Sequence, residues 1–233
     1  MSNVDPLANV VWSALTTNHA SFAEGAGRAR RYLPGVSVFT GMVDDDPASW
    51  ADLAALAGPG RGVVLFRELD VVAPDGWTVL GGGRGHQMVL TGSLPAVAPG
   101  TELVELGTAD APEMAALVEL AKPGPWGPRT HELGGYLGIR DPSSGMLLAM
   151  AGRRISIPGL TEVSAVSTHP DARRRGYGEA VTVAVAQRLL DEGITPFLHV
   201  AETNDSARRV YERIGFTTRR MTQFAALRTP GAA

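Results

Sequence analysis

The fold is decided by residues 162–216, which read EVSAVSTHPDARRRGYGEAVTVAVAQRLLDEGITPFLHVAETNDSARRVYERIGF. The apolar, β-branched start of this stretch predicts a strand over 162–168, and a similar run predicts another over 196–201. Between them, apolar residues recur at i, i+4 and i+8, which predicts a helix over 178–192 with one buried face. A further helix is expected over 206–214. Strands that alternate with helices in this way predict an α/β layer with a partly parallel sheet.

The loop between the first strand and the first helix is rich in glycine and arginine, with the sequence PDARRRGYG over 170–178. It leads to a helix N-terminus, where unsatisfied N–H groups and the positive end of the helix dipole attract an anion. Gly176 and Gly178 carry no Cβ atom, so backbone amides can approach phosphate oxygens closely. The three arginines add fork-shaped donors. A pyrophosphate fits these features, whereas the Gly-x-Gly pattern alone would equally suit a solvated basic turn before an ordinary helix.

A second motif downstream favours the pyrophosphate interpretation. It is Asn-x-x-Ala-x-x-x-Tyr-x-x-x-Gly-Phe, over 204–216. Together with the Arg-x-x-Gly-x-Gly loop at 173–178, it resembles the GNAT superfamily of N-acetyltransferases, which use acetyl-CoA. Within that superfamily, the run SAVSTHPD at 164–171 and the leading partial domain look most like the glycine-N-acyltransferase-like branch. The resemblance covers residues 101–227 and implies an α/β (α+β) fold, a GNAT-like mixed sheet flanked by helices, preceded by a smaller α/β domain that is a candidate degenerate copy.

The resemblance implies an acetyl-CoA site built from the strand, the loop and the second helix. Backbone groups of the strand would pair with the pantetheine arm as an added strand does, since two diverging parallel strands leave edge groups unpaired. Backbone amides of 174–179 would hold the pyrophosphate, and Asn204 would bond the pantetheine, with helix N-capping as its alternative role. The cofactor-binding residues implied in this way are Val166, Ser167, Thr168, Arg173, Arg174, Arg175, Gly176, Tyr177, Gly178, Glu179, Asn204 and Tyr211.

Tyr211 is the candidate general acid. It shares a helix face with Ala207, Val210 and Ile214, so its ring is expected to point inward. By the resemblance, it would lie near the thioester sulfur and protonate the CoA thiolate as it leaves. A phenol has a pKa of about 10 and a thiol about 8.5, so this proton transfer needs a concerted or tuned step. A plain core tyrosine would explain the same spacing.

Two residues are candidates for the base that takes the proton from the attacking ammonium, directly or through water. Glu162 begins the strand, where many members of the superfamily carry a carboxylate, but an ordinary Glu at about 4.3 would need an upward pKa shift. His199 matches the position of a glutamate base in some relatives, and an ordinary His titrates near 6.5. An exposed strand-end acid and a buried histidine bonded across the sheet are the structural alternatives, and we favour Glu162 slightly. Chain order alone places His131, Glu132 and Tyr136 at the acceptor pocket.

These residues together predict an acetyl-CoA-dependent N-acetyltransferase, in which a primary amine attacks the thioester directly within a ternary complex. A backbone N–H of the strand 162–168 would stabilise the tetrahedral oxyanion, and positioning of the two bound reactants would supply much of the acceleration. The alternative is a non-catalytic module that binds acyl-CoA as a sensor. The acceptor amine is not identified by the sequence, because acceptor pockets lie on loops and helices with weak signals.

The whole chain divides at a connection rich in proline and glycine, TGSLPAVAPG over 91–100. This connection predicts an N-terminal partial α/β domain over 1–97 and an acetyl-CoA-binding N-acyltransferase domain over 98–233. In the first of these we expect a helix over 10–32. We also expect a hairpin whose turn is the glycine run 81–85, which is disfavoured as a phosphate cradle because no helix follows it.

Composition excludes several classes of protein. The 233 residues are 44% hydrophobic and 19% charged, enough to bury a core, and no apolar run approaches the roughly 18 residues that span a bilayer. Cysteine is absent, which excludes disulfides and a thiol nucleophile, and the five histidines lack metal-ligand spacing, so no metal is expected. A net charge of −3 argues against nucleic-acid binding. The N-terminus carries an acid where a signal peptide carries positive charge, so we expect a cytoplasmic protein without membrane or nucleic-acid partners.

Overall fold

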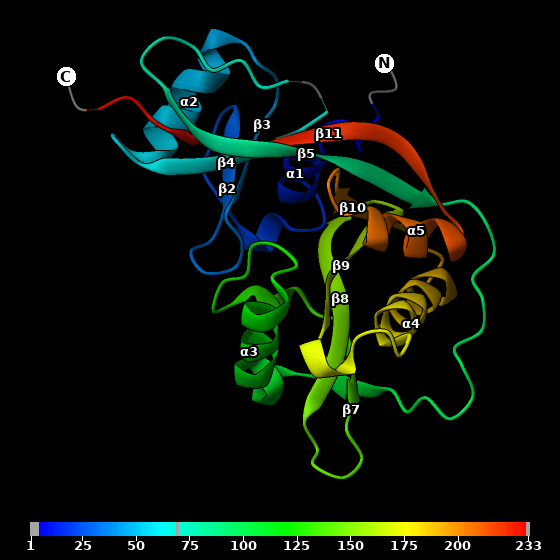
Figure 1. The fold of residues 1–233 in the computed structure, drawn as a ribbon. Coiled ribbons are helices and arrows are strands. Elements are labelled where there is room, and N and C mark those ends of the chain that lie inside the picture. The colour runs from blue at the N-terminus through cyan, green and yellow to red at the C-terminus, as the bar shows by residue number, and fades with distance from the viewer. Residues whose placement is uncertain (1–4, 69, 232–233) are drawn as a thin grey trace.

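A computed structural model describes residues 5–68 and 70–231 of the chain. Within these ranges, the strands form one mixed sheet of eleven, in the order β1-β2-β3-β4-β11-β5-β10-β9-β8-β7-β6. Figure 1 shows this sheet together with the helices that flank it. The strands are β1 (Ala23–Glu24), β2 (Ala29–Tyr32), β3 (Phe39–Met42), β4 (Gly62–Arg67), β5 (Thr78–Leu90), β6 (Val104–Leu106), β7 (Tyr136–Arg140), β8 (Leu147–Ile157), β9 (Leu160–Thr168), β10 (Thr195–Ala201) and β11 (Phe216–Arg228). The α-helices are α1 (Val10–Leu15), α2 (Pro47–Ala57), α3 (Ala111–Ala121), α4 (Tyr177–Asp191) and α5 (Asp205–Arg213). A mixed sheet flanked by helices confirms the predicted fold class.

The C-terminal half of the sheet carries helices on both faces. Ala149 and Ala151 of β8 pack in the same cluster as α4 and α5, whereas Met150 between them packs with α3. Successive residues of a strand point to opposite faces of a sheet, so α4 and α5 cover one face and α3 covers the other. Leu189 of α4 is fully buried, and burial of such a side chain contributes about 1.5–3 kcal/mol to stability. In the described ranges, no helix combines the length and the apolar character that crossing a membrane requires.

Two parallel strands separate in the middle of this half. β9 and β10 pair over three residues on each strand, ending at Glu162 opposite Phe197, although β9 continues to Thr168. β10 pairs with β5 on its other side. A bulge bends β9 at Ala165, where φ is 53° and the register with β8 shifts. Beyond Glu162, the edge of β9 that faces β10 therefore has N–H and C=O groups without a strand partner in the described part of the chain.

The N-terminal half contains a second parallel pair. β3 and β4 pair over two residues on each strand, ending at Thr40 opposite Leu65, and α2 connects them. The sequence favours a helix here: α2 has Asp46 at the N-cap and Pro47 at its first position, and Gly58 follows its end. The order strand, helix, parallel strand is therefore the same as in β9, α4 and β10.

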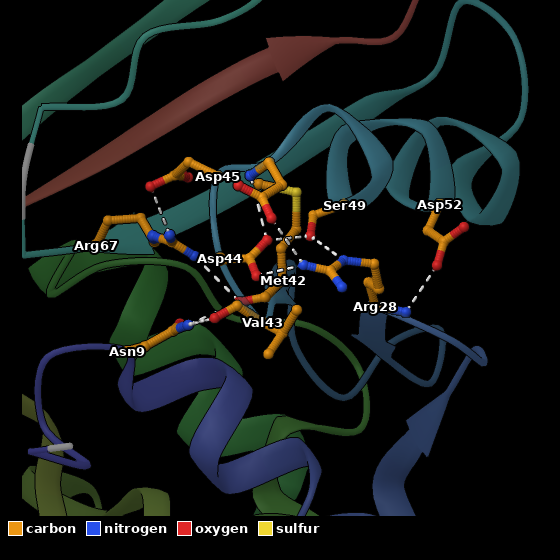
Figure 2. Close-up of polar contacts among 10 residues, drawn as sticks. Asn9, Arg28, Met42, Val43, Asp44, Asp45, Ser49, Asp52 and Arg67 are labelled. Carbon is orange, nitrogen blue, oxygen red and sulfur yellow. Dashed lines mark hydrogen bonds and ion pairs between the residues drawn. The ribbon is translucent and has the colours of Figure 1, made fainter. Parts of the chain in front are cut away.

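Polar contacts fix the loop before α2. Arg28 donates hydrogen bonds to Asp44 and to Ser49, and the Ser49 hydroxyl donates to Asp44, as Figure 2 shows. Arg67 of β4 forms an ion pair with Asp45. The acids of this loop are therefore neutralised by arginines of the same half of the molecule.

The hairpin predicted at the glycine run 81–85 is wrong. β5 is one continuous strand, paired with β11 from Thr78 to Leu90. Glycine is required because neighbours crowd this strand: a Cβ atom on Gly82 would lie 2.5 Å from the carbonyl oxygen of Phe224. The glycine run thus permits close backbone approach inside a sheet, and it makes no turn.

The helix predicted over 10–32 is also wrong beyond its first turns. α1 ends at Leu15, and residues 29–32 form β2, which pairs with β3. Gly25 and Gly27 have φ angles of 116° and 61°. These are conformations that glycine adopts readily and a right-handed helix does not contain, so the chain leaves the helical path before β2.

Candidate active site

A pocket of about 650 Å³ lies where β9 extends past its pairing with β10, between the start of α4 and one face of α5. All the predicted cofactor-binding residues line it except Ser167 and Arg175. The side chain of Ser167 is buried and donates a hydrogen bond to the Ala165 carbonyl. The lining consists of Ala121, Val166, Thr168, Arg173, Arg174, Gly176, Tyr177, Gly178, Glu179, Asn204, Ser206, Ala207, Val210, Tyr211 and Arg213.

The loop before α4 presents a row of free backbone amides. In the described part of the chain, the N–H groups of 174–179 donate no hydrogen bond to another residue. Arg174 and Gly176 have φ angles of 65° and 78°. Left-handed residues within a turn direct successive amides to one side and create an anion-binding concavity. A Cβ atom on Gly178 would lie 3.2 Å from the Thr168 hydroxyl, so glycine lets the loop close onto β9.

Charge around this loop is mainly positive. Arg173 and Arg174 line the pocket, and Arg213 of α5 forms an ion pair with Glu179 in the first turn of α4. Arg175 instead lines a separate cavity of about 170 Å³, which the connection 96–101 forms with α4. The free amides, the N-terminus of α4 and two arginines together suit an anion.

Asn204 caps α5, and it also borders the pocket. At the N-cap, its Oδ1 accepts a hydrogen bond of 3.2 Å from the Ala207 amide. The Ser206 hydroxyl donates to the same oxygen. The side-chain oxygen is thereby occupied, and the side-chain NH₂ group is the donor that remains for a ligand.

Tyr211 projects from α5 into the core side of the same pocket. Its side chain is 8% exposed, and Phe216 packs against its ring edge at a centroid distance of 6.3 Å. Burial raises the pKa of Tyr211 to about 12. The phenol therefore stays protonated at neutral pH and can act only as a proton or hydrogen-bond donor toward an anion.

Glu162 and His199 touch each other at the point where β9 and β10 separate, outside the lining of the pocket. Glu162 is fully buried, so the alternative of an exposed strand-end acid is wrong. Arg154 of β8 binds it through two hydrogen bonds of 2.8 and 2.6 Å, and His199 Nδ1 lies 2.7 Å from its Oε1. Burial by itself would raise the pKa of Glu162, but the Arg154 and His199 contacts outweigh burial and hold the pKa at about 2.

Both nitrogen atoms of His199 have partners. The amide nitrogen of Gln87 lies 3.1 Å from His199 Nε2 and 3.1 Å from the Leu7 carbonyl oxygen. Since this nitrogen can only donate, Nε2 accepts and the proton sits on Nδ1, directed at Glu162. Burial lowers the pKa of His199, and the nearby Glu162 opposes that effect only in part. His199 is thus the buried histidine bonded across the sheet that the sequence allowed as an alternative.

Arg154 and Gln87 are the residues that sequence reasoning missed. Arg154 stands in the apolar strand LLAMAGRRISI, and an arginine buried there needs a carboxylate partner, which was the available signal. Gln87 gave no signal of its own. This cluster pairs opposite charges, and the described ranges contain no group of three or more His, Asp or Glu side chains placed to hold a metal ion.

The residues expected at an acceptor pocket do not share one cavity. Tyr136 lines a small cavity of about 10 Å³ together with Trp126 and Arg154, on the face of the sheet covered by α3. His131 and Glu132 belong to a 3₁₀ turn and are absent from this lining. Of the three, only Tyr136 is therefore brought next to β9.

Comparisons with known proteins agree with this geometry. The model of the family described as FR47-like protein matches residues 136–225. The crystal structure of a GNAT-family acetyltransferase from Novosphingobium aromaticivorans is 32% identical, covers 98% of this chain and 100% of that chain, and has a TM-score of 0.87. A GCN5-related N-acetyltransferase from Kribbella flavida shares the fold, with 21% identity, coverage of 97% and 96%, and a TM-score of 0.65.

Mycothiol acetyltransferases are similar over a shorter stretch. The Mycobacterium leprae protein is 42% identical over 67 residues, which are 26% of this chain and 22% of that relative. The Mycobacterium ulcerans protein is 34% identical over 113 residues, 43% of this chain and 35% of the relative. The match thus spans about a fifth to a third of these relatives. The end-to-end similarity to a solved GNAT structure is the broader finding, and it shows that this chain belongs to the GNAT family of N-acetyltransferases.

Proposed function

We propose that this protein transfers an acetyl group from acetyl-CoA to a primary amine by direct attack in a ternary complex. The observation that carries the proposal is one pocket lined both by the loop 174–179, whose amides have no partner among the described residues, and by Tyr211. An anionic group fits the first feature, and a leaving thiolate needs a proton donor such as the second. Membership of the GNAT family supports the same reaction.

In the proposed complex the donor lies along the pocket from the loop to Tyr211. The diphosphate accepts hydrogen bonds from the amides of 174–179, and the pantetheine arm pairs with the free edge of β9 at Val166–Thr168. Asn204 donates its side-chain NH₂ to a pantetheine carbonyl. The added-strand arrangement is favoured because it satisfies the edge groups that β10 leaves open.

In the proposed reaction the amine nitrogen attacks the thioester carbonyl carbon, and the carbonyl oxygen becomes an oxyanion. A backbone N–H near the β9 bulge stabilises this charge. The C–S bond then breaks, and the hydroxyl of Tyr211 gives its proton to the CoA sulfur. The products are an amide and CoA with a free thiol.

Glu162 and His199 stay the two candidates for the acceptor of the amine proton. Neither lines the pocket, so both would act through water. Glu162, with a pKa of about 2, is a weak base, and His199 already accepts a hydrogen bond at Nε2. This arrangement favours a second candidate function, a sensor that binds acyl-CoA without turnover.

Two finer assignments belong to the same proposal. The run 164–171 supports placement in the glycine-N-acyltransferase-like branch of the family. The connection at 91–100 supports a division into a partial α/β domain over 1–97 and the acetyl-CoA-binding domain over 98–233, with the proposed site in the second.

The test is to incubate the protein with acetyl-CoA and a panel of primary amines, and to measure free thiol together with the acetylated amine by mass spectrometry. A reaction without amine controls for hydrolysis. Equal amounts of free thiol and acetylated amine are expected. Tight binding of acetyl-CoA without product for any amine would favour the sensor, and the absence of binding at millimolar acetyl-CoA would contradict both functions.

A further inference from the structure

Glu179 and Arg213 form an ion pair that links α4 to α5 within the lining of the pocket. Glu179 lies in the first turn of α4 and Arg213 in the last turn of α5, and Arg213 Nη2 donates to Glu179 Oε2. Both side chains line the pocket. They are 31% and 60% exposed, respectively, so the pair contributes little to stability and can exchange partners readily.

The position of this carboxylate matters for anion binding. Glu179 is itself the last residue of the loop 174–179. Its carboxylate lies in the first turn of α4, where the helix dipole favours negative charge. A phosphate entering this loop meets a like charge. Arg213 neutralises that charge in the ion pair, and its side chain has the length and the fork of donors to bind a phosphate instead.

We propose that Arg213 binds a phosphate of the acyl-CoA donor, and that Glu179 holds the Arg213 side chain until the donor binds. Arg213 therefore increases the affinity for the donor, and Glu179 lowers it. The proposal rests on the proposed acetyl-CoA site and adds two residues with opposite effects to it. On binding, Arg213 moves from the carboxylate of Glu179 to a phosphate oxygen, and no covalent step is involved.

A purely structural role makes a different prediction. If the pair only holds α4 and α5 together, loss of either partner loosens the same contact, and both variants weaken donor binding. Arg208 offers a matched control, because it belongs to α5 and pairs with Asp205 and Glu212 of that helix, away from the pocket lining.

The experiment measures dissociation constants of the full chain by titration calorimetry. The ligands are acetyl-CoA and acetyl-pantetheine, which lacks the nucleotide and its phosphates. Arg213→Ala is expected to weaken acetyl-CoA binding about tenfold, the effect of a charge-assisted hydrogen bond. Glu179→Gln is expected to strengthen it about threefold, as removal of an exposed like charge does. Neither substitution is expected to change the affinity for acetyl-pantetheine. Arg208→Ala is expected to change the affinity for neither ligand.

Two results overturn the inference while the proposed function stands. One is unchanged acetyl-CoA affinity in Arg213→Ala. The other is a loss of affinity in both Arg213→Ala and Glu179→Gln. If the unmodified protein binds no acetyl-CoA, the proposed function fails and this inference fails with it.

Discussion

The two halves of the sheet contain the same unit, a strand, a helix and a second parallel strand, with different chemistry at the start of the helix. Before α4, the N-cap is Gly176, and three arginines precede it. Before α2, the N-cap is Asp46, and a neighbouring Asp44 accepts hydrogen bonds from Arg28 and Ser49 (Figure 2). Hydrogen bonds from Ser49 and Arg28 hold the pKa of Asp44 below its ordinary value.

The backbone unit alone therefore does not make an anion site. Both helices have a positive end, but at α2 the chain supplies its own carboxylates and the arginines that neutralise them. At α4 the acid of the first turn, Glu179, pairs with Arg213, whereas the amides of 174–179 donate no hydrogen bond within the described part of the chain and border a pocket. Substitutions that exchange these side chains should therefore give the start of one helix the properties of the start of the other.

The largest effect is expected where the parallel strands of each unit stop pairing. Glu162→Ala leaves the charge of Arg154 buried without its partner, which costs about 3–5 kcal/mol of folding stability. At the matching position of the other unit, Thr40→Val removes one hydrogen bond to the Val64 carbonyl, at a cost of about 1 kcal/mol. Urea unfolding of both variants checks the ranking, and equal effects would contradict the difference drawn between the two units.

Acid unfolding sharpens this prediction. The folded-state pKa of Glu162, about 2, lies below its ordinary 4.5. Its contribution to stability is therefore complete above about pH 4.5 and is lost as the pH falls toward 2. Glu162→Ala should flatten this part of the curve of stability against pH.

The next largest effect is expected from giving the α4 loop the chemistry of the α2 loop. Arg174→Asp places a carboxylate beside the free amides, and Asp tolerates the left-handed backbone at this position. We expect acetyl-CoA affinity to fall more than about 100-fold, which corresponds to about 2.7 kcal/mol. Arg174→Asn keeps the backbone preference and removes only the charge, so its loss should be smaller, about tenfold. Unchanged affinity in the aspartate variant would show that the diphosphate binds elsewhere.

Substitution of one tyrosine in each half, Tyr211 and Tyr32, tests which half takes part in catalysis. Tyr211→Phe should lower kcat about 100-fold, the lower end of the range for general acids, and leave the dissociation constant of acetyl-CoA unchanged. Burial raises the pKa of Tyr211 to about 12, so the phenol stays protonated up to about pH 10. Deprotonation of Tyr211 should therefore cause no loss of activity below that pH. Tyr32→Phe is the control, because its hydroxyl contacts His19 in the N-terminal half. Steady-state kinetics with equal kcat for the two variants would remove the acid role of Tyr211.

The smallest effect is expected from opening the α2 loop. Asp44→Asn removes one partner of Arg28, and Asp46 remains beside it. Because Arg28 and Asp44 are only partly buried and Arg28 keeps Asp46 as a partner, the melting temperature should change by less than about 3 °C, and acetyl-CoA affinity should not change. Differential scanning calorimetry and calorimetric titration check the two statements. A loss of affinity would mean that the N-terminal unit takes part in donor binding.

The sequence predicted the C-terminal unit well because its signals are local. The glycines and arginines of the α4 loop, the apolar stripe of α4 and the Asn204 cap each act within a few residues. For the same reason, α2 follows from Asp46, Pro47 and Gly58. Residues in loop and helix motifs of this kind can be placed without knowing how the rest of the sheet is paired.

The failures at the glycine run 81–85 and at Glu162 have long-range causes. The glycines of β5 looked like a turn, because the strand that crowds them, β11, lies more than 130 residues away in sequence. The surroundings of Glu162 depend on Arg154, His199 and Gln87, which three different strands contribute. A single sequence gives no spacing rule for such contacts, so the exposed acid that it allowed at 162 is in fact the centre of a buried cluster.

The most direct measurement of the central claim is the change of backbone amide resonances in ¹H–¹⁵N NMR spectra on addition of acetyl-CoA. Large shifts are expected for residues 174–179, whose amides gain diphosphate oxygens as acceptors, and none for residues 44–49 at the start of α2. Saturation with acetyl-CoA that leaves 174–179 unshifted, or that shifts the α2 loop instead, would contradict it.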